Sequence, residues 1–127
     1  MKFIYFLLVL FVCQVNGQQV EVKNLQKHIY FLADDKIKGR GTGSKQNSKA
    51  SKYIANEFKK LALQPLGTDG YFQNFTAKVK RVVVPDSIRS ARNVIGFLDN
   101  QAAKTIVIGA HYDHIGEGKQ GSSLAEN

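Results

Sequence analysis

Apolar side chains recur at helical spacing early in the chain. Between residues 20 and 34, Leu25, His28, Ile29 and Leu32 fall on one face of a helix, which predicts an amphipathic helix over this stretch. A histidine on such a face is usually packed and hydrogen-bonded. We therefore expect His28 to be a structural residue rather than a ligand.

A second amphipathic helix is predicted over residues 46–63. Ser44 or Asn47 is suited to cap its start, and Pro65 followed by Gly67 closes it. Its apolar stripe consists of Ala50, Ile54, Phe58 and Leu61, with Tyr53 beside it.

The two predicted helices are joined by a glycine-rich run, residues 39–44, with the sequence Gly-Arg-Gly-Thr-Gly-Ser. Glycines at close spacing can cradle a phosphate, but the phosphate-binding templates need a preceding strand and a further glycine at a fixed offset. Both are missing here, so we predict a structural loop. We expect Arg40 to pair with a nearby carboxylate, which the sequence does not identify.

The pattern changes to strand character after residue 70. Residues 71–80 alternate in the strand manner and residues 82–84 prolong them, a turn is expected at 85–87, and residues 93–98 form the next predicted strand. Residues 104–110 form the last predicted strand, and its short continuous apolar run, which starts at Ile106, is typical of a strand buried on both faces. Two helices followed by such strands predict the entry to an α/β sheet with residues 104–110 at its centre.

Chemically active side chains follow that last predicted strand directly. In the run His111-Tyr112-Asp113-His114, His111 and Asp113 are two residues apart and so share one face of an extended chain. An imidazole beside a carboxylate suits zinc, either as two ligands or as one ligand and the group that orients it. The carboxyl ends of strands are also where open α/β sheets bind ligands. A cluster of satisfied surface histidines is the alternative, and spacing alone leaves both open.

The first residues have the pattern of a secretory signal peptide. Lys2 gives a positive start, residues 3–12 are almost wholly apolar, and residues 15–17 offer a cleavage site. The apolar run is too short for a membrane span, and a buried helix or a retained anchor is the alternative. Val12 argues against lipid attachment at Cys13. We expect residues 1–17 to be removed, leaving a secreted or periplasmic chain that has no cysteine and does not associate with the membrane.

Composition limits the size and the partners. The 127 residues make at most one small domain, and the formal net charge is +8, with basic residues concentrated in 36–52 and 78–92. Aromatic residues are not interleaved with these charges in a stacking pattern, and an exported protein meets little nucleic acid. We therefore expect a solvated basic surface and no nucleic-acid partner.

Residues 109–116, Gly-Ala-His-Tyr-Asp-His-Ile-Gly, closely resemble the first metal-site segment of the secreted zinc-dependent aminopeptidases. This is the family of bacterial leucyl aminopeptidases, glutamate carboxypeptidase and the transferrin-receptor ectodomain. Upstream segments resemble the same family in the same order, over about residues 25–118 in all. They are 31–35 and 39–44 (its N-terminal helix and glycine loop), 53–67 (its second helix and exit) and 93–96 (the strand before the metal strand).

The resemblance implies roles for two side chains. His111 would be a ligand of one zinc in a two-zinc site, and Asp113 would be the carboxylate behind it that orients the imidazole. No role carries over to His114, for which we expect a structural or rim position. The implied fold is a three-layer α/β/α zinc-peptidase sheet, of which residues 18–127 would be the incomplete N-terminal portion.

The resemblance also implies an activity. The complete enzyme would hydrolyse peptides at a free amino terminus, with two zinc ions activating a water and a glutamate taking its proton. The family's bridging aspartate, its general-base glutamate and its remaining ligands lie in segments with no match in the 127 residues. Because catalytic zinc needs about three protein ligands, we expect a truncated and inactive catalytic domain. A glutaminyl cyclase-like acyltransferase of the same fold, a non-catalytic receptor-like ectodomain and a small basic binding module are the alternatives.

Overall fold

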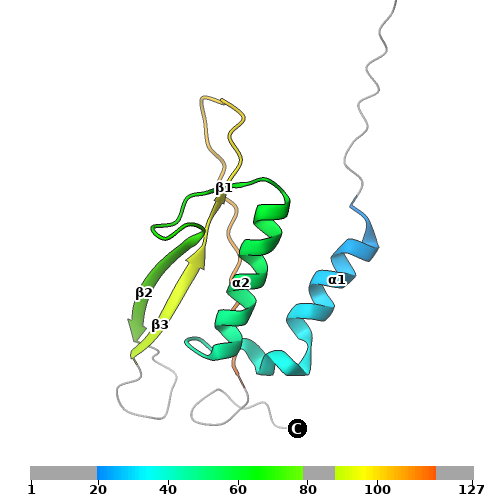
Figure 1. The fold of residues 1–127 in the computed structure, drawn as a ribbon, viewed down its shortest axis with the longest axis vertical. Coiled ribbons are helices and arrows are strands. Elements are labelled where there is room, and N and C mark those ends of the chain that lie inside the picture. Colours follow the sequence, from blue (N-terminus) through cyan, green and yellow to red (C-terminus); the bar gives the residue numbers. More distant parts are fainter. Residues whose placement is uncertain (1–19, 79–87, 117–127) are drawn as a thin grey trace, which may run out of the picture.

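A computed structural model describes residues 20–78 and 88–116, and it combines helices with two small antiparallel sheets. In chain order the elements are α1 (Val22–Ala33), the 3₁₀ helix η1 (Asp35–Arg40), α2 (Lys45–Lys60), β1 (Gln64–Pro65), β2 (Phe72–Lys78), β3 (Ile88–Val94) and β4 (Gly96–Phe97). Figure 1 shows α2 between α1 and the β2–β3 pair. The fold is therefore a mixed α/β fold. The predicted signal peptide and the predicted turn at 85–87 lie outside the described residues.

Both predicted helices are confirmed. The Ser44 hydroxyl accepts a hydrogen bond from the backbone N–H of Asn47 at 3.0 Å, so Ser44 is the N-cap of α2. The run at residues 39–44 was expected to be a loop, whereas Gly39 and Arg40 form the end of η1. Lys38 and Gly39 leave helical geometry inside η1, with φ of 46° and 62°. This break redirects the chain into the glycine run.

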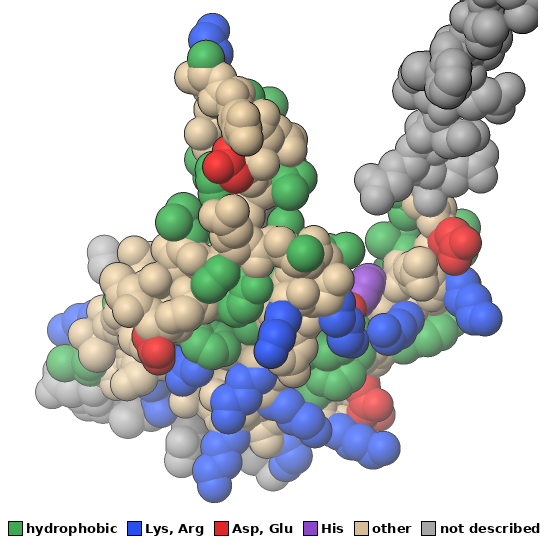
Figure 2. Space-filling view, turned by 45° about the horizontal axis from the view of Figure 1, so that its top comes forward, with side chains coloured by type: hydrophobic (Ala, Val, Ile, Leu, Met, Phe, Trp, Pro, Cys, Tyr) green, Lys and Arg blue, Asp and Glu red, His purple; other side chains and the backbone are tan. Residues whose placement is uncertain are grey.

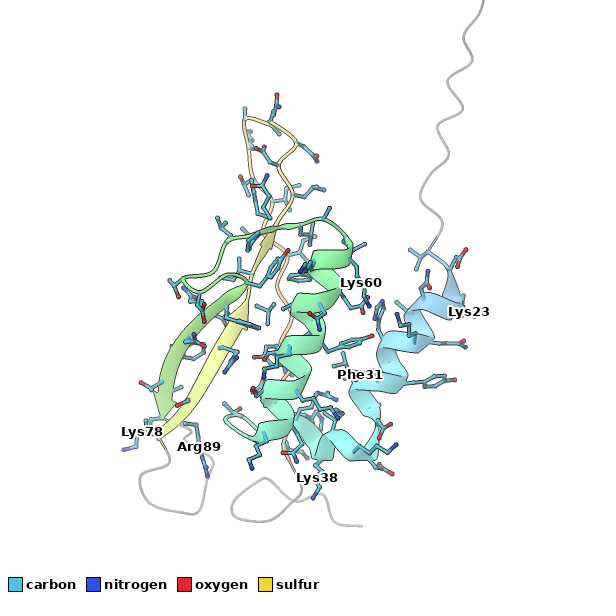
Figure 3. All side chains as sticks on the ribbon, viewed as in Figure 1. Lys23, Phe31, Lys38, Lys60, Lys78 and Arg89 are labelled. Atoms are coloured by element: carbon cyan, nitrogen blue, oxygen red, sulfur yellow. The ribbon has the colours of Figure 1, made fainter. Side chains whose placement is uncertain are left out.

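The contact between α1 and α2 is built on Tyr53. Its ring stacks on Phe31 with centroids 3.8 Å apart, and its hydroxyl lies 2.7 Å from His28 Nδ1. In Figure 3 Phe31 lies between the two helices. His28 is thus half-buried and hydrogen-bonded, as expected of a structural histidine. The predicted apolar face of α1 is covered along one edge only, since Leu25 and Ile29 remain 52% and 55% exposed.

The strands pair in two antiparallel sheets. β2 pairs with β3 from Phe72 opposite Val94 to Lys78 opposite Ile88, and β4 pairs with β1. The predicted strand over 71–80 is confirmed as β2 within the described residues. The single strand expected over 93–98 is divided: β3 starts earlier, at Ile88, and β4 turns to a different partner. The break is at Ile95, whose N–H donates to the Tyr71 carbonyl at 2.8 Å.

The prediction of a central buried strand at residues 104–110 is wrong for this structure. No described residue pairs with this segment in a sheet, and Ile106, Val107 and Ile108 are 86%, 89% and 93% exposed. The physical reason is the lack of neighbours, because a central strand needs a partner on each edge. Here β3 is paired with β2, and β4 with β1. The chain after β4 instead projects beyond the sheets, at the top of Figure 1.

The best-buried part of the described chain lies where η1 meets α2. Its apolar members are Ile37, Ala50 and Ala55, which are 2%, 0% and 7% exposed, and Asn47 and Ser51 are buried with them. Both polar residues are satisfied, because the Asn47 amide donates to the Arg40 carbonyl and the Ser51 hydroxyl to that of Ser48. This small core therefore fixes the glycine run that follows η1.

The outer surface of the same region is basic. Figure 2 shows Lys and Arg side chains gathered over the lower part of the molecule. The exposed lysines of η1 and the first half of α2 are Lys36, Lys38, Lys45, Lys49 and Lys52. Among the described helices, none combines the length and the apolar character that crossing a membrane requires.

Candidate metal centre

Residues 112–116 lie against the glycine run that precedes α2. The backbone N–H of His114 donates to the Arg40 carbonyl at 3.1 Å, and that of Gly116 donates to the Gly39 carbonyl at 3.0 Å. Gly41 and His114 form a parallel bridge. The end of the segment that carries the candidate ligand is therefore held in a fixed register by a turn far from it in sequence.

Glycine is needed in this turn because the two backbones approach closely. A Cβ on Gly39 would lie 2.5 Å from the Gly116 carbonyl oxygen, and one on Gly41 would lie 3.3 Å from Gly116 Cα. The turn points carbonyl oxygens at the facing N–H groups, which is the opposite of an anion cradle. This agrees with the predicted structural loop. Arg40 Nε donates to the Tyr112 carbonyl at 2.8 Å, and no carboxylate among the residues that the structure describes pairs with Arg40.

Hydrogen bonding sets the state of the His111 imidazole. Its Nδ1 lies 2.9 Å from the Asp113 carbonyl oxygen and 3.5 Å from Asp113 Oδ1. A carbonyl oxygen can only accept, so Nδ1 carries the proton. In the neutral ring the lone pair is then on Nε2, which suits it to bind a metal. The side chain is 83% exposed, so that nitrogen is accessible.

The Asp113 carboxylate is held from its other side. Its Oδ2 accepts a hydrogen bond from the Thr42 hydroxyl at 2.8 Å, while Oδ1 faces His111. The expectation that His111 and Asp113 share one face is confirmed. Sequence reasoning missed Thr42, and the only signal for it was a hydroxyl residue set between two glycines of the run.

Tyr112 points the opposite way and anchors the segment. Its hydroxyl donates to the Arg92 carbonyl of β3 at 2.6 Å. Burial raises the pKa of Tyr112, as does the Asp113 carboxylate, while the neighbouring Ser51 hydroxyl and the charge of Arg92 act against the rise. Tyr112 thus anchors the segment to β3.

His114 takes no part in the His111–Asp113 pair. Its backbone forms the bridge to Gly41, and its side chain is exposed. Whether it lies at the rim of a metal site stays a prediction.

The described residues provide one imidazole and one supporting carboxylate. Within residues 20–78 and 88–116, no group of three or more His, Cys, Asp or Glu side chains could hold a metal ion. The chemistry of the pair nevertheless fits zinc, because an Nε2 donor backed by a hydrogen bond at Nδ1 is the usual form of a zinc-bound histidine. The segment therefore presents one imidazole suited to bind a metal, and the described residues do not complete a metal site.

The chain matched nothing when it was compared with models of protein families, with curated proteins and with solved structures.

Proposed function

We propose that the chain belongs to a secreted zinc-dependent metallopeptidase that hydrolyses peptides at a free amino terminus, with His111 as one zinc ligand. The observation that carries the proposal is the hydrogen bonding of His111. Its Nδ1–H donates a hydrogen bond to the Asp113 backbone carbonyl oxygen, 2.9 Å away. This leaves the lone pair of Nε2 free to bind a metal, on a side chain that is exposed. Asp113 is the supporting carboxylate that the family resemblance implies.

The position of the site gives further support. The resemblance joins the glycine run at 39–44 and the metal segment at 109–116, which are about 70 residues apart in sequence. In the structure these two segments are in direct contact through the bonds from His114 to Arg40 and from Gly116 to Gly39. We propose residues 18–127 as the N-terminal portion of the three-layer catalytic domain, and residues 1–17 as its signal peptide.

The residues of this chain would bind the zinc ion and orient the imidazole that holds it. Zinc, when bound, supplies an activated water and a Lewis acid that polarises the peptide carbonyl. The His111 Nε2 atom would be a metal donor, and the Asp113 carboxylate would limit rotation of the ring. The hydroxyl of Tyr112 donates to β3, so it would anchor the segment rather than serve as a metal ligand.

The proposal is tested on the protein encoded by the complete open reading frame that contains these 127 residues. We expect release of the amino-terminal residue from peptides with a free amino group, and loss of that release with a zinc chelator. His111→Ala should lower the rate by more than about 100-fold, because it removes a ligand rather than a supporting group. His114→Ala is the matched control, since it removes an exposed imidazole three positions away, and it should retain most of the activity.

The same assay separates the alternatives. Conversion of amino-terminal glutamine to pyroglutamate, without peptide hydrolysis, would indicate the glutaminyl cyclase-like acyltransferase. A folded protein without either activity and without bound zinc would contradict the enzyme proposal and favour the receptor-like ectodomain.

A further inference from the structure

Three side chains from two distant segments form a chain of polar contacts. The Thr42 hydroxyl lies 2.8 Å from Asp113 Oδ2. The other carboxylate oxygen lies 3.5 Å from His111 Nδ1, whose closer partner is the Asp113 backbone carbonyl oxygen at 2.9 Å. Carboxylate oxygens only accept, so the Thr42 hydroxyl must donate. A hydrogen bond to a charged acceptor is roughly twice as strong as one between neutral groups.

We propose that Thr42 is a positioning residue for the metal-binding imidazole and that it acts through Asp113. Its hydroxyl holds one carboxylate oxygen, which directs the other toward the Nδ1–H of His111. This carboxylate contact adds to the hydrogen bond between Nδ1–H and the Asp113 backbone carbonyl, at 2.9 Å. Together they favour the tautomer with the proton on Nδ1, and Nε2 is kept as the free donor. The consequence for zinc rests on the proposed function, whereas the effect on the tautomer does not.

Thr42 is suited to this role because its own position is fixed. The turn is closed by the Ser44 N–H, which donates to the Gly41 carbonyl at 3.0 Å, and by Asn47, whose buried amide donates to the Arg40 carbonyl at 3.3 Å. Gly43 lies against β3, where a Cβ would be 3.0 Å from that of Arg89. The hydroxyl therefore projects from a rigid part of the molecule.

Asp113 and His111 need such support because they are themselves exposed. The Asp113 side chain is 45% exposed and that of His111 is 83% exposed, so packing restrains neither. The backbone bonds at His114 and Gly116 fix the path of the segment but not the rotation of the carboxylate. Among the described contacts, the Thr42 hydroxyl is the one that selects a carboxylate orientation.

The test measures the tautomer of His111 directly. The protein from the complete open reading frame is labelled with ¹⁵N at histidine, freed of metal with a chelator, and studied by NMR at about pH 8.5, where an imidazole is neutral. The His111 signals are assigned by their loss in His111→Gln. We expect Thr42→Val, which removes the hydroxyl and keeps the shape, to lower the ratio of the Nδ1–H to the Nε2–H tautomer roughly two- to tenfold, as for one net hydrogen bond.

Two variants serve as controls. Thr42→Ser keeps the hydroxyl and should restore the wild-type ratio. Thr68→Val removes a hydroxyl that donates to the Phe72 carbonyl instead, so it should leave the ratio unchanged. An unchanged ratio in Thr42→Val, with native amide signals for α2, would overturn the proposal. Failure of Thr42→Ser to restore the ratio would do the same.

Asp113→Asn gives a second measurement that does not disturb the turn. It should lower the ratio of the Nδ1–H to the Nε2–H tautomer, as Thr42→Val does. Because Thr42 acts through this carboxylate, the ratio in the variant that carries both substitutions should be no lower than in Asp113→Asn alone. Additive effects would contradict that route. Zinc affinity, measured by competition with a chelator, should fall by roughly 10- to 100-fold in Thr42→Val. If wild type binds no zinc, the proposed function fails, and the tautomer ratios still decide the role of Thr42.

Discussion

Two glycines with almost the same backbone conformation differ in what surrounds them. Gly39 has φ of +62° and faces the Gly116 carbonyl, whereas Gly70 has φ of +60° and open space within 4 Å. An alanine at either position meets the cost of left-handed backbone, about 1–2 kcal/mol. Only at Gly39 does the added methyl also collide with a neighbouring chain.

We therefore expect Gly39→Ala to cost more than about 2 kcal/mol and to release residues 112–116 from the turn. Hydrogen exchange followed by mass spectrometry checks this, through faster exchange in the peptide that contains His114 and Gly116. Gly70→Ala is the matched control and should leave that peptide protected. Equal protection of this peptide in both variants would show that the close approach of Gly39 and Gly116 does not hold residues 112–116 in place.

Glu57 carries a charge-dependent contact between the two helices. Its carboxylate lies 2.6 Å from Lys60 Nζ and 4.0 Å from Lys27 Nζ of α1. The hydrogen bond from Lys60 lowers the pKa of Glu57, and the charge of Lys27 adds to this. Because the pKa of Glu57 is lower in the folded than in the unfolded protein, the ionised carboxylate stabilises the native form at a pH above the ordinary glutamate pKa. This stabilisation is lost as the pH falls through the pKa of the folded state.

We expect a small loosening of α1 from α2 on acidification below about pH 4, near the ordinary glutamate pKa. The near-ultraviolet circular dichroism of the stacked Tyr53 and Phe31 rings reports this contact. Glu57→Gln should remove the acid step. A step of the same size in that variant would assign it to another carboxylate.

At the scale of elements, the exposed apolar segment of residues 105–110 stands out. It combines β-branched residues, unpaired backbone within the described structure and almost full exposure of Ile106, Val107 and Ile108. Segments of this kind add strands from other molecules to their edges. We infer that, among the residues the structure describes, this segment favours self-association.

Val107→Lys should therefore shift the onset of self-association to higher protein concentration, as measured by light scattering. Leu66→Lys is the control, because Leu66 is 62% exposed but lies outside the segment. An equal rise of the onset concentration in both variants would show that the added charge, and not the loss of an apolar residue from this segment, reduces self-association.

The elements that sequence predicted correctly are those whose information is local. The spacing of apolar residues located α1 and α2, and Ser44 was one of two suggested caps. Residues 104–110 were predicted wrongly, because an apolar run reports a tendency to be buried but not whether neighbouring strands are there to bury it. The Thr42–Asp113 contact joins positions 71 apart in the chain, and no periodicity or local pattern carries that information.

At the scale of the whole molecule, burial is limited. Within the described residues the buried apolar side chains are Ile37, Ala50 and Ala55. A core of this size provides little of the apolar burial that drives cooperative unfolding. We expect residues 18–127 alone to unfold over a broad range or to aggregate in a calorimetric scan. A single sharp and reversible transition would contradict this expectation.

The metal content of the same fragment is a separate measurement. We expect no zinc to remain in stoichiometric amount after dialysis, because one histidine and a supporting carboxylate cannot replace about three ligands. Elemental analysis checks this, with the protein from the complete open reading frame as the comparison. One firmly held zinc per fragment would reveal ligands in addition to His111.

The bonds that hold the candidate ligand also set the order in which it can form. Arg40 and Thr42 reach Tyr112 and Asp113 across 72 and 71 positions, whereas the helices form from neighbouring residues. Closing so long a loop costs chain entropy before any contact repays it. During synthesis the glycine turn cannot make these contacts until residue 116 has emerged from the ribosome. We infer that docking of this segment is a late step of folding, and that a metal ion would meet a prepared histidine only after it.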